Sequence, residues 1–239
     1  MEKIKYIHKS SENEPFIVVY KAKGIPSAPL AENDESVVTL VKADFPEIMN
    51  VHGKKEIEGG LLHRLDTATD GLLLIAVNQE FYDDLIQQQK NGTFVKSYKS
   101  ECDFVKDYCS KKDGFSEHKI KLNAENTVTS KFRYFGQNNS EVRPVTEESG
   151  KAALKKCIQK DYSTKIKITS ENGKYFADCS IEEGFKHQVR CHLAWCGFPV
   201  SGDKVYNVEE NLCGEEMKFS AYKIEFFNSI TGKKMIFQI

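Results

Sequence analysis

The chain has 239 residues, of which 40% are hydrophobic, so it can bury a substantial core as a single domain, residues 1–239, with room for two lobes. No apolar run is long enough to cross a bilayer, and seven irregularly spaced cysteines indicate a reducing, cytoplasmic location without a disulfide framework. The formal net charge of −1 excludes a uniformly basic nucleic-acid-binding surface, so any such surface must be a local patch.

The N-terminal segment, residues 1–14, is polar and is expected to be a frayed terminus or an edge strand. Residues 16–20 are rich in β-branched and aromatic side chains, which predicts a strand. Asn33 or Asp34 is expected to cap a short helix that ends before Pro46. The apolar residues of this helix are Val37, Val38, Leu40 and Val41.

A run of six apolar residues, 72–77, predicts a strand buried on both faces, since it is short and follows a turn signal at residues 70–71. Residues 63–69 then form a short loop whose far end is anchored in the core, a position typical of catalytic side chains. Asn78 is expected to cap a helix that stops at residues 91–92. Its apolar stripe is Phe81, Tyr82, Leu85 and Ile86.

The middle of the chain predicts one strand, residues 93–104, followed by residues 105–150, which show no regular pattern. The even spacing of this strand places three residues on one face, namely Phe94, Tyr98 and Cys102. Residues 151–159 predict a helix.

The C-terminal part predicts two strands, residues 163–169 and 175–181, and a helix over residues 187–196. A final hairpin pairs residues 219–227 with residues 234–239. Strands dominate and show no repeating βαβ rhythm. The expected fold class is therefore α+β, with a mixed, mainly antiparallel central sheet and flanking helices and loops.

Two long motifs carry the strongest chemical signal: HRLDTATDGLLLIAV at residues 63–77 and GFKHQVRCHLAWCGFPVSGDKVY at residues 184–206. Together they resemble the paired signatures of the RluA/RsuA-type pseudouridine synthases, H-R-L-D-x-x-T-S-G-L-L-L-x-A and G-R-x-H-Q-I-R-x-H-L-x-x-x-G-x-P-I-x-G-D-x-x-Y. Residues 17–26, IVVYKAKGIP, and residues 96–98, KSY, are similar to that family's V-V-Y-K-P-x-G-x-P and K-x-Y elements. The resemblance runs in order from about Phe16 to the C-terminus.

This resemblance implies the pseudouridine synthase fold and an enzyme that isomerises uridine to pseudouridine in ribosomal or transfer RNA. The reaction breaks the bond between uracil N1 and ribose C1′ and rejoins the base through C5, so we expect neither a metal nor an organic cofactor. Asp66 matches the family's catalytic aspartate, which acts beside C1′ as a nucleophile, a base or a stabiliser of a cationic intermediate.

Two further residues match the family's catalytic set. Arg190 matches the arginine that pairs with the catalytic aspartate, and a bidentate guanidinium would keep Asp66 oriented and ionised. Tyr98 matches the active-site tyrosine, whose ring can stack on the detached uracil and whose hydroxyl can help to move the C5 proton. Asp70 is expected to be a turn residue. Lys21 is expected to support the active-site loop structurally.

RNA contacts are also implied by the resemblance. Arg64 matches the residue that can fill the space left by an extruded base, while His63, His187 and Gln188 are expected contacts to phosphate or backbone. The family's arginine after the motif glycine is Phe185 here, and the positive charge is displaced to Lys186.

RNA is the expected partner, and the protein is expected to be a monomer. The S4-type RNA-binding domain common in relatives does not fit before Phe16. Affinity is therefore expected to come from the catalytic domain itself or from a small or highly structured target. Lys and Arg gather between Lys90 and Arg133, although most of these side chains are expected to be ordinary solvated surface.

Two alternatives belong to other functional classes. His187 with Cys191, and His192 with Cys196, have the i,i+4 spacing of metal ligands, but the two pairs point about 100° apart on a helix and cannot share one ion. The second alternative is a non-catalytic RNA-binding or folding factor on the same fold. The presence of Asp66, Tyr98 and Arg190 together favours an enzyme.

Overall fold

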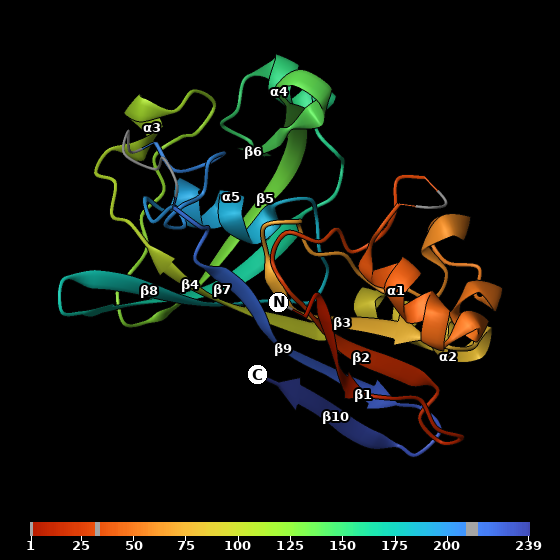
Figure 1. Cartoon of the computed structure of the whole chain (residues 1–239). Helices are drawn as coiled ribbons and strands as arrows, with labels where there is room; N and C mark the ends of the chain where they lie inside the picture. Colours follow the sequence, from red (N-terminus) through yellow and green to blue (C-terminus); the bar gives the residue numbers. More distant parts are fainter. Residues whose placement is uncertain (1, 32–33, 209–214) are drawn as a thin grey trace. The chain divides into compact units, whose positions relative to one another are not determined.

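A computed structural model, which describes residues 2–31, 34–208 and 215–239, divides the chain into two compact units (Figure 1). Unit 1 comprises Met1–Ser97 and Ser220–Ile239, and unit 2 comprises Tyr98–Phe219. Among the described helices, none is both long and apolar enough to cross a membrane.

Unit 1 is built on five strands. In chain order these are β1 (Ile4–His8), β2 (Phe16–Lys21), β3 (Asp70–Ala76), most of β9 (Phe219–Asn228), and β10 (Lys233–Gln238). They pair in the order β1–β2–β3–β9–β10, and only the β3–β9 pair is parallel among the pairs described within the units. β3 is buried from Gly71 onward, which confirms the predicted buried strand. The N-terminal segment contains an edge strand, β1.

Four helical segments belong to unit 1. They are α1 (Val37–Asp44), η1 (Pro46–Asn50), η2 (Glu56–Glu58) and α2 (Gln79–Lys90). Asn78 caps α2 as predicted, because its side chain accepts a hydrogen bond from the Phe81 N–H at 2.9 Å. The predicted cap of α1 was wrong. Ser36 caps this helix through a reciprocal pair of hydrogen bonds with Thr39, whereas Asn33 lies outside the described residues.

The core of unit 1 lies between its strands and α2, and aromatic rings form its centre. Phe16 of β2 stacks on Phe81 of α2 at 5.4 Å and meets Phe226 of β9 edge-on at 5.1 Å. All three side chains are almost completely buried. The aromatic stripe of α2 is therefore core packing, which fixes the helix to β2 and β9.

Unit 2 holds the remaining strands. These are most of β4 (Val95–Cys102), β5 (Glu125–Phe135), β6 (Glu141–Val145), β7 (Tyr162–Glu171) and β8 (Lys174–Ile181), in the spatial order β4–β8–β7–β5–β6. Helix α5 (Gln188–Trp195) packs on β6 and β7. Shorter helical segments are α3 (Tyr108–Lys111), η3 (Gln137–Asn139) and α4 (Lys151–Lys156). Among the pairs that the structure describes, antiparallel ones predominate and one is parallel, which confirms the predicted α+β class.

The structure corrects four predictions in unit 2 and at its boundary. The region 105–150, which lacked a recognisable pattern, contains β5 and β6. The sequence did not predict β5 because the polar Ser130 lies on its inward face and interrupts the apolar alternation. The helix predicted over residues 151–159 ends at Lys156. The strand predicted over residues 93–104 is shorter, because β4 begins at Val95 and ends at Cys102. His187 precedes α5 with a positive φ of 54°.

Candidate active site

The loop that carries Asp66 leaves and re-enters the core of unit 1 beside β3. Its incoming leg pairs with that strand: the Leu62 N–H donates to the Leu74 carbonyl at 3.0 Å, and the Ala76 N–H donates to the Gly60 carbonyl at 2.8 Å. A Cβ at Gly60 would lie 1.9 Å from the Ala76 carbonyl oxygen, so this close approach requires glycine. The two ends of the Asp66 loop are thus fixed by one buried strand.

Ser27 holds the middle of the Asp66 loop. Its hydroxyl donates to the Leu65 carbonyl at 2.8 Å and accepts from the Leu65 N–H at 2.9 Å, and its side chain is almost completely buried. The loop also closes on itself, because the Thr69 N–H donates to the Asp66 carbonyl at 2.9 Å. Sequence reasoning missed Ser27. Its type and its place after Pro26 give no indication of a partner 38 residues away.

Lys21 supports the same loop from β2, as expected. Its buried ammonium group donates to the Ile25 carbonyl at 2.8 Å, the Ala22 carbonyl at 3.1 Å and the Thr67 carbonyl at 3.3 Å. Burial lowers the pKa of Lys21 to about 8, and the carboxylates of Asp70 and Asp66 partly oppose this shift. Lys21 therefore links the loop to the strand and contributes positive charge near Asp66.

The two carboxylates of the first motif have different surroundings. Asp66 is half-buried in the loop, whereas Asp70 begins β3 and accepts a hydrogen bond from the Tyr20 hydroxyl at 2.8 Å. Asp70 and the Tyr20 hydroxyl lie on neighbouring strands of the sheet. A strand-to-strand contact of this kind gives Asp70 a structural role.

His63 and Arg64 differ in exposure. Both ring nitrogens of His63 are buried, and neither has a hydrogen-bond partner in the described part of the chain. Burial and the charge of Lys96 lower the pKa of His63 to about 3, so the ring is neutral and offers no charge to a phosphate. The side chain of Arg64 is 58% exposed, and its Nη1 lies 3.2 Å from Oε1 of Glu58.

In unit 2, Tyr98 lies in β4 with one face of its ring covered. It stacks on Phe219 at a centroid distance of 5.2 Å and an angle of 5° between the ring planes, and the residue is only 7% exposed. This packing fixes the plane of the ring. A planar group could therefore stack on Tyr98 only from the face opposite Phe219.

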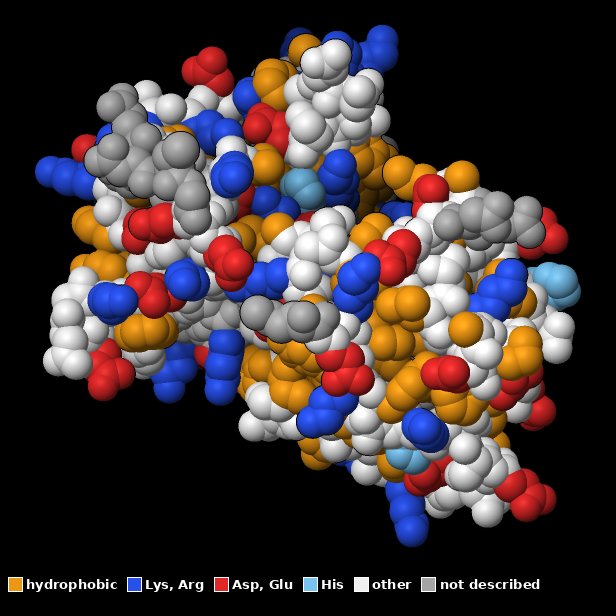
Figure 2. All heavy atoms as spheres, viewed as in Figure 1, with side chains coloured by type: hydrophobic (Ala, Val, Ile, Leu, Met, Phe, Trp, Pro, Cys, Tyr) orange, Lys and Arg blue, Asp and Glu red, His pale blue; other side chains and the backbone are white. Residues whose placement is uncertain are grey.

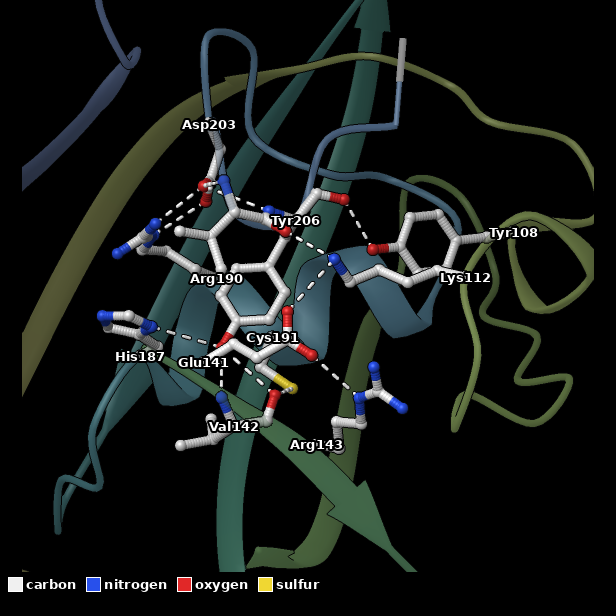
Figure 3. Close-up of polar contacts among 11 residues, drawn as sticks. Tyr108, Lys112, Glu141, Val142, Arg143, His187, Arg190, Cys191, Asp203 and Tyr206 are labelled. Atoms are coloured by element: carbon white, nitrogen blue, oxygen red, sulfur yellow. Dashed lines mark hydrogen bonds and ion pairs between the residues drawn. The ribbon is translucent and has the colours of Figure 1, made fainter. Parts of the chain in front are cut away.

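Arg190 forms a buried bidentate ion pair with Asp203 (Figure 3). Arg190 Nε donates to Oδ2 and Nη2 donates to Oδ1, both at 2.7 Å. Asp203 also accepts from the backbone N–H groups of Val205 and Tyr206 at 2.9 and 3.2 Å. Burial alone would raise the pKa of Asp203, but the guanidinium and these N–H groups outweigh it and lower that pKa. Asp203 therefore fixes the orientation of Arg190 within unit 2.

Tyr206 continues this network toward β6. Its buried hydroxyl accepts from the Val142 N–H at 2.9 Å and donates to the Val142 carbonyl at 3.2 Å, and His187 Nδ1 lies 3.3 Å away (Figure 3). Sequence reasoning assigned no role to Asp203 or Tyr206, although both belong to the quoted second motif. Their positions in that motif were the only feature of the sequence that could have indicated a role for these two residues.

Gln188 and His192 have packing roles within unit 2. The Gln188 amide donates to the Ser163 carbonyl at 2.9 Å and accepts from the Phe185 N–H at 2.9 Å, and its side chain is buried. The two ring nitrogens of His192 lie 2.8 Å from Thr164 Oγ1 and 3.0 Å from Ser130 Oγ. Among the described residues, no cluster of three His, Cys, Asp or Glu side chains could hold a metal ion, so the two i,i+4 pairs gain no further ligand.

Comparison with known proteins gives a consistent result. The family model described as RNA pseudouridylate synthase matches residues 15–195. A ribosomal large subunit pseudouridine synthase D of Neisseria meningitidis is 24% identical over 240 residues, which cover 95% of this chain and 56% of that protein. A tRNA pseudouridine(31) synthase of Saccharomyces cerevisiae is 28% identical over 216 residues, 87% of this chain and 48% of that protein. The chain thus spans about half the length of these two relatives.

Solved structures show the same fold. Human RNA Pseudouridylate Synthase Domain Containing 1 matches with a TM-score of 0.66 and 16% identity, over 99% of this chain and 82% of that one. Human RNA Pseudouridylate Synthase Domain Containing 4 matches with a TM-score of 0.64 and 14% identity, over 98% of this chain and 87% of that one. These matches confirm the fold expected from the sequence motifs.

Replacing Ser27 with alanine should loosen the Asp66 loop. The change leaves the buried N–H and carbonyl of Leu65 without a partner, which should cost about 1–3 kcal/mol of the free energy of unfolding. Hydrogen exchange at the Leu65 amide should accelerate relative to the wild type. Ser110→Ala is the control, because its hydroxyl bonds a carbonyl at an exposed site. Unchanged exchange at Leu65 in Ser27→Ala would show that Ser27 does not hold the loop.

Asp203→Asn should destabilise the protein by about 3–5 kcal/mol near neutral pH, because it leaves the buried charge of Arg190 without its partner. The folded-state pKa of Asp203 is lowered, so its stabilising contribution is fully present above the unfolded pKa of about 3.9 and is lost as the pH falls through the folded value. Urea unfolding at several pH values should therefore show a weaker acid dependence in Asp203→Asn than in the wild type. Asp161→Asn, which breaks an exposed pair with Lys131, should change little.

Proposed function

Because the chain belongs to the RNA pseudouridylate synthase family, we propose that it isomerises uridine to pseudouridine in ribosomal or transfer RNA. Relatives of both substrate classes support this range: the Neisseria protein is named for the large ribosomal subunit and the yeast protein for tRNA. The observation that carries the proposal is the Asp66 loop, whose backbone is held by Ser27, Lys21 and β3. Such preorganisation is what a catalytic carboxylate needs.

Asp66 is the proposed catalytic carboxylate. Cleavage of the bond between N1 and C1′ leaves an electron-poor sugar carbon, and a carboxylate beside that carbon can attack it, stabilise it or accept a proton. Holding the loop backbone in place before the substrate arrives avoids the entropy cost of ordering it during the reaction. Lys21 places a positive charge near the carboxylate of Asp66.

Arg190 is the proposed partner of Asp66, as the motif match implies. Its ion pair with Asp203 supports this role, because a guanidinium whose Nε and Nη2 are already bound keeps a fixed plane. Asp203 would then act as a positioning residue for Arg190. Tyr98 is proposed to stack on the detached uracil, and its stacking on Phe219 supports a fixed ring plane.

The proposed RNA contacts are Arg64, Lys186 and His187. Arg64 is exposed and long enough to enter the space of an extruded base. Lys186 is exposed, and its Nζ donates to the Asn139 carbonyl at 2.6 Å. Gln188 and His63 do not belong to this set, because the amide of Gln188 is bonded to protein groups and the neutral ring of His63 is buried.

Asp66→Asn should abolish isomerisation while folding and RNA binding persist, because the amide keeps the size of the side chain but not its charge. Release of tritium from RNA that contains 5-³H-uridine measures the reaction. Asp70→Asn is the matched control, four residues away in the same motif, and should keep its activity because Asp70 bonds Tyr20. Tritium release by Asp66→Asn at the wild-type rate would exclude Asp66 as the catalytic carboxylate. An inactive wild-type protein that still binds RNA would favour the non-catalytic RNA-binding factor.

Arg190→Lys and Arg64→Lys should differ in how their effects depend on the RNA. Lysine cannot reproduce the two coplanar hydrogen bonds that the Arg190 guanidinium donates to Asp203. Arg190→Lys should therefore lose most activity on every substrate. Arg64→Lys should impair base extrusion, and should therefore slow tritium release from a structured RNA much more than from a short unpaired oligonucleotide with the same uridine. Equal losses for both variants on both substrates would refute this division of roles.

A further inference from the structure

The β5–β6 hairpin of unit 2 places two arginines side by side. Arg133 and Arg143 are direct partners in the antiparallel register, a position in which like charges destabilise a sheet. Their guanidinium groups converge on Gly114, where a Cβ would lie 2.9 Å from Nη1 of Arg143 and 3.3 Å from Nη2 of Arg133. The hairpin therefore keeps two cations together at an electrostatic cost.

Aromatic and acidic neighbours fix the orientation of these cations. The guanidinium of Arg143 lies 3.2 Å from the centroid of the Phe135 ring, and that of Arg133 lies 5.4 Å from the same centroid. Arg143 Nε also donates to Oε1 of Glu141 at 2.8 Å. The Arg143 side chain is 10% exposed, so it is held in one arrangement by its surroundings. Its donors are preorganised and need no large rearrangement to bind an anion.

The charges around the hairpin do not cancel. Glu141 is shared, because its Oε2 lies 3.3 Å from Lys112 Nζ while its Oε1 binds Arg143 (Figure 3). Over the described ranges, no carboxylate forms an ion pair with Arg133. Among the described residues, Glu141 is thus the one carboxylate that pairs with both Arg143 and Lys112, and Arg133 has no such pair. Figure 2 shows Lys and Arg side chains, with acidic side chains among them, over the area that α5 and β6 occupy in Figure 1.

We propose that Arg133 and Arg143 form a binding site for a phosphate of the RNA backbone. This site deepens the function proposed above and rests on it. Two guanidinium groups offer the parallel N–H donors that suit phosphate oxygens, and a bound phosphate would offset the repulsion between the arginines. Lys186, anchored to Asn139 at the tip of the same hairpin, adds a further cation nearby. The site supplies local positive charge to a chain whose net charge is −1.

The test measures the salt dependence of binding to two short RNA hairpins of unrelated sequence. Loss of one phosphate contact should reduce the slope of log Kobs against log salt by roughly 0.7–0.9. Arg133→Gln should show this reduction and should weaken binding to both RNAs by the same factor, because phosphate contacts carry no sequence information. Arg133→Lys should keep most of the slope but bind more weakly, since it retains the charge and loses the planar fork.

The matched control is Lys131→Gln, which removes one charge from the same strand two residues away. Lys131 is already paired with Asp161 at 2.6 Å, so the salt slope should stay at the wild-type value. Without RNA, the melting temperature of Arg133→Gln should equal or exceed that of the wild type, because the like-charge pair is relieved.

The site would be overturned by a wild-type slope in Arg133→Gln, by an equal loss of slope in Lys131→Gln, or by a wild-type protein that binds neither RNA hairpin. Binding of poly-glutamate as tightly as RNA, with the same loss in Arg133→Gln, would indicate an acidic protein partner and would also overturn it. Tritium release separates this test from the proposed activity. If the wild-type protein releases no tritium but Arg133→Gln shows the expected change in slope, the phosphate site stands and the proposed isomerase activity is refuted. If the wild-type protein is active but the slope of Arg133→Gln is unchanged, the activity stands and the phosphate site is refuted.

Discussion

The backbone pairing of β3 is the constraint on which the candidate active site depends. One edge of this strand pairs with β2, and the other pairs with β9 at its start and with the segment before the Asp66 loop. The chain enters and leaves the Asp66 loop beside the same strand, so the length and the position of this loop are fixed. Ser27 and Lys21 then bind the loop carbonyls that no strand can reach. The half-buried carboxylate of Asp66 is thus carried by a rigid support.

In unit 2, the ion pair of Arg190 and Asp203 holds a candidate catalytic side chain in place. A buried charge pair contributes little net stability unless its remaining donors and acceptors are satisfied. Asp203 meets this condition through two backbone N–H groups, and Tyr206 extends the network from the second motif to β6. The value of such a pair lies in orientation, because a guanidinium held at two nitrogens has little rotational freedom.

The sequence predicted those elements whose signals are local. The apolar run of β3, the Asn78 cap and the final hairpin follow from short-range patterns, and the two motifs indicated the family and the fold. What it could not predict depends on distant contacts. Ser130 faces inward and bonds His192, so a polar residue interrupts the apolar alternation by which β5 would have been predicted. Ser27 and Asp203 gain their roles only from partners that the fold brings to them, and neither residue type reveals its partner.

The Tyr206 hydroxyl has a consequence for solubility. β6 is the last strand in the order of its unit, and an edge strand with open N–H and carbonyl groups can recruit a strand from another molecule. Tyr206 bonds both groups of Val142, so that a side chain takes the place of a neighbouring strand. Pro144, two residues further on, lacks an N–H to offer. The tyrosine that ends the second motif therefore leaves neither backbone group of Val142 open to a strand of another molecule.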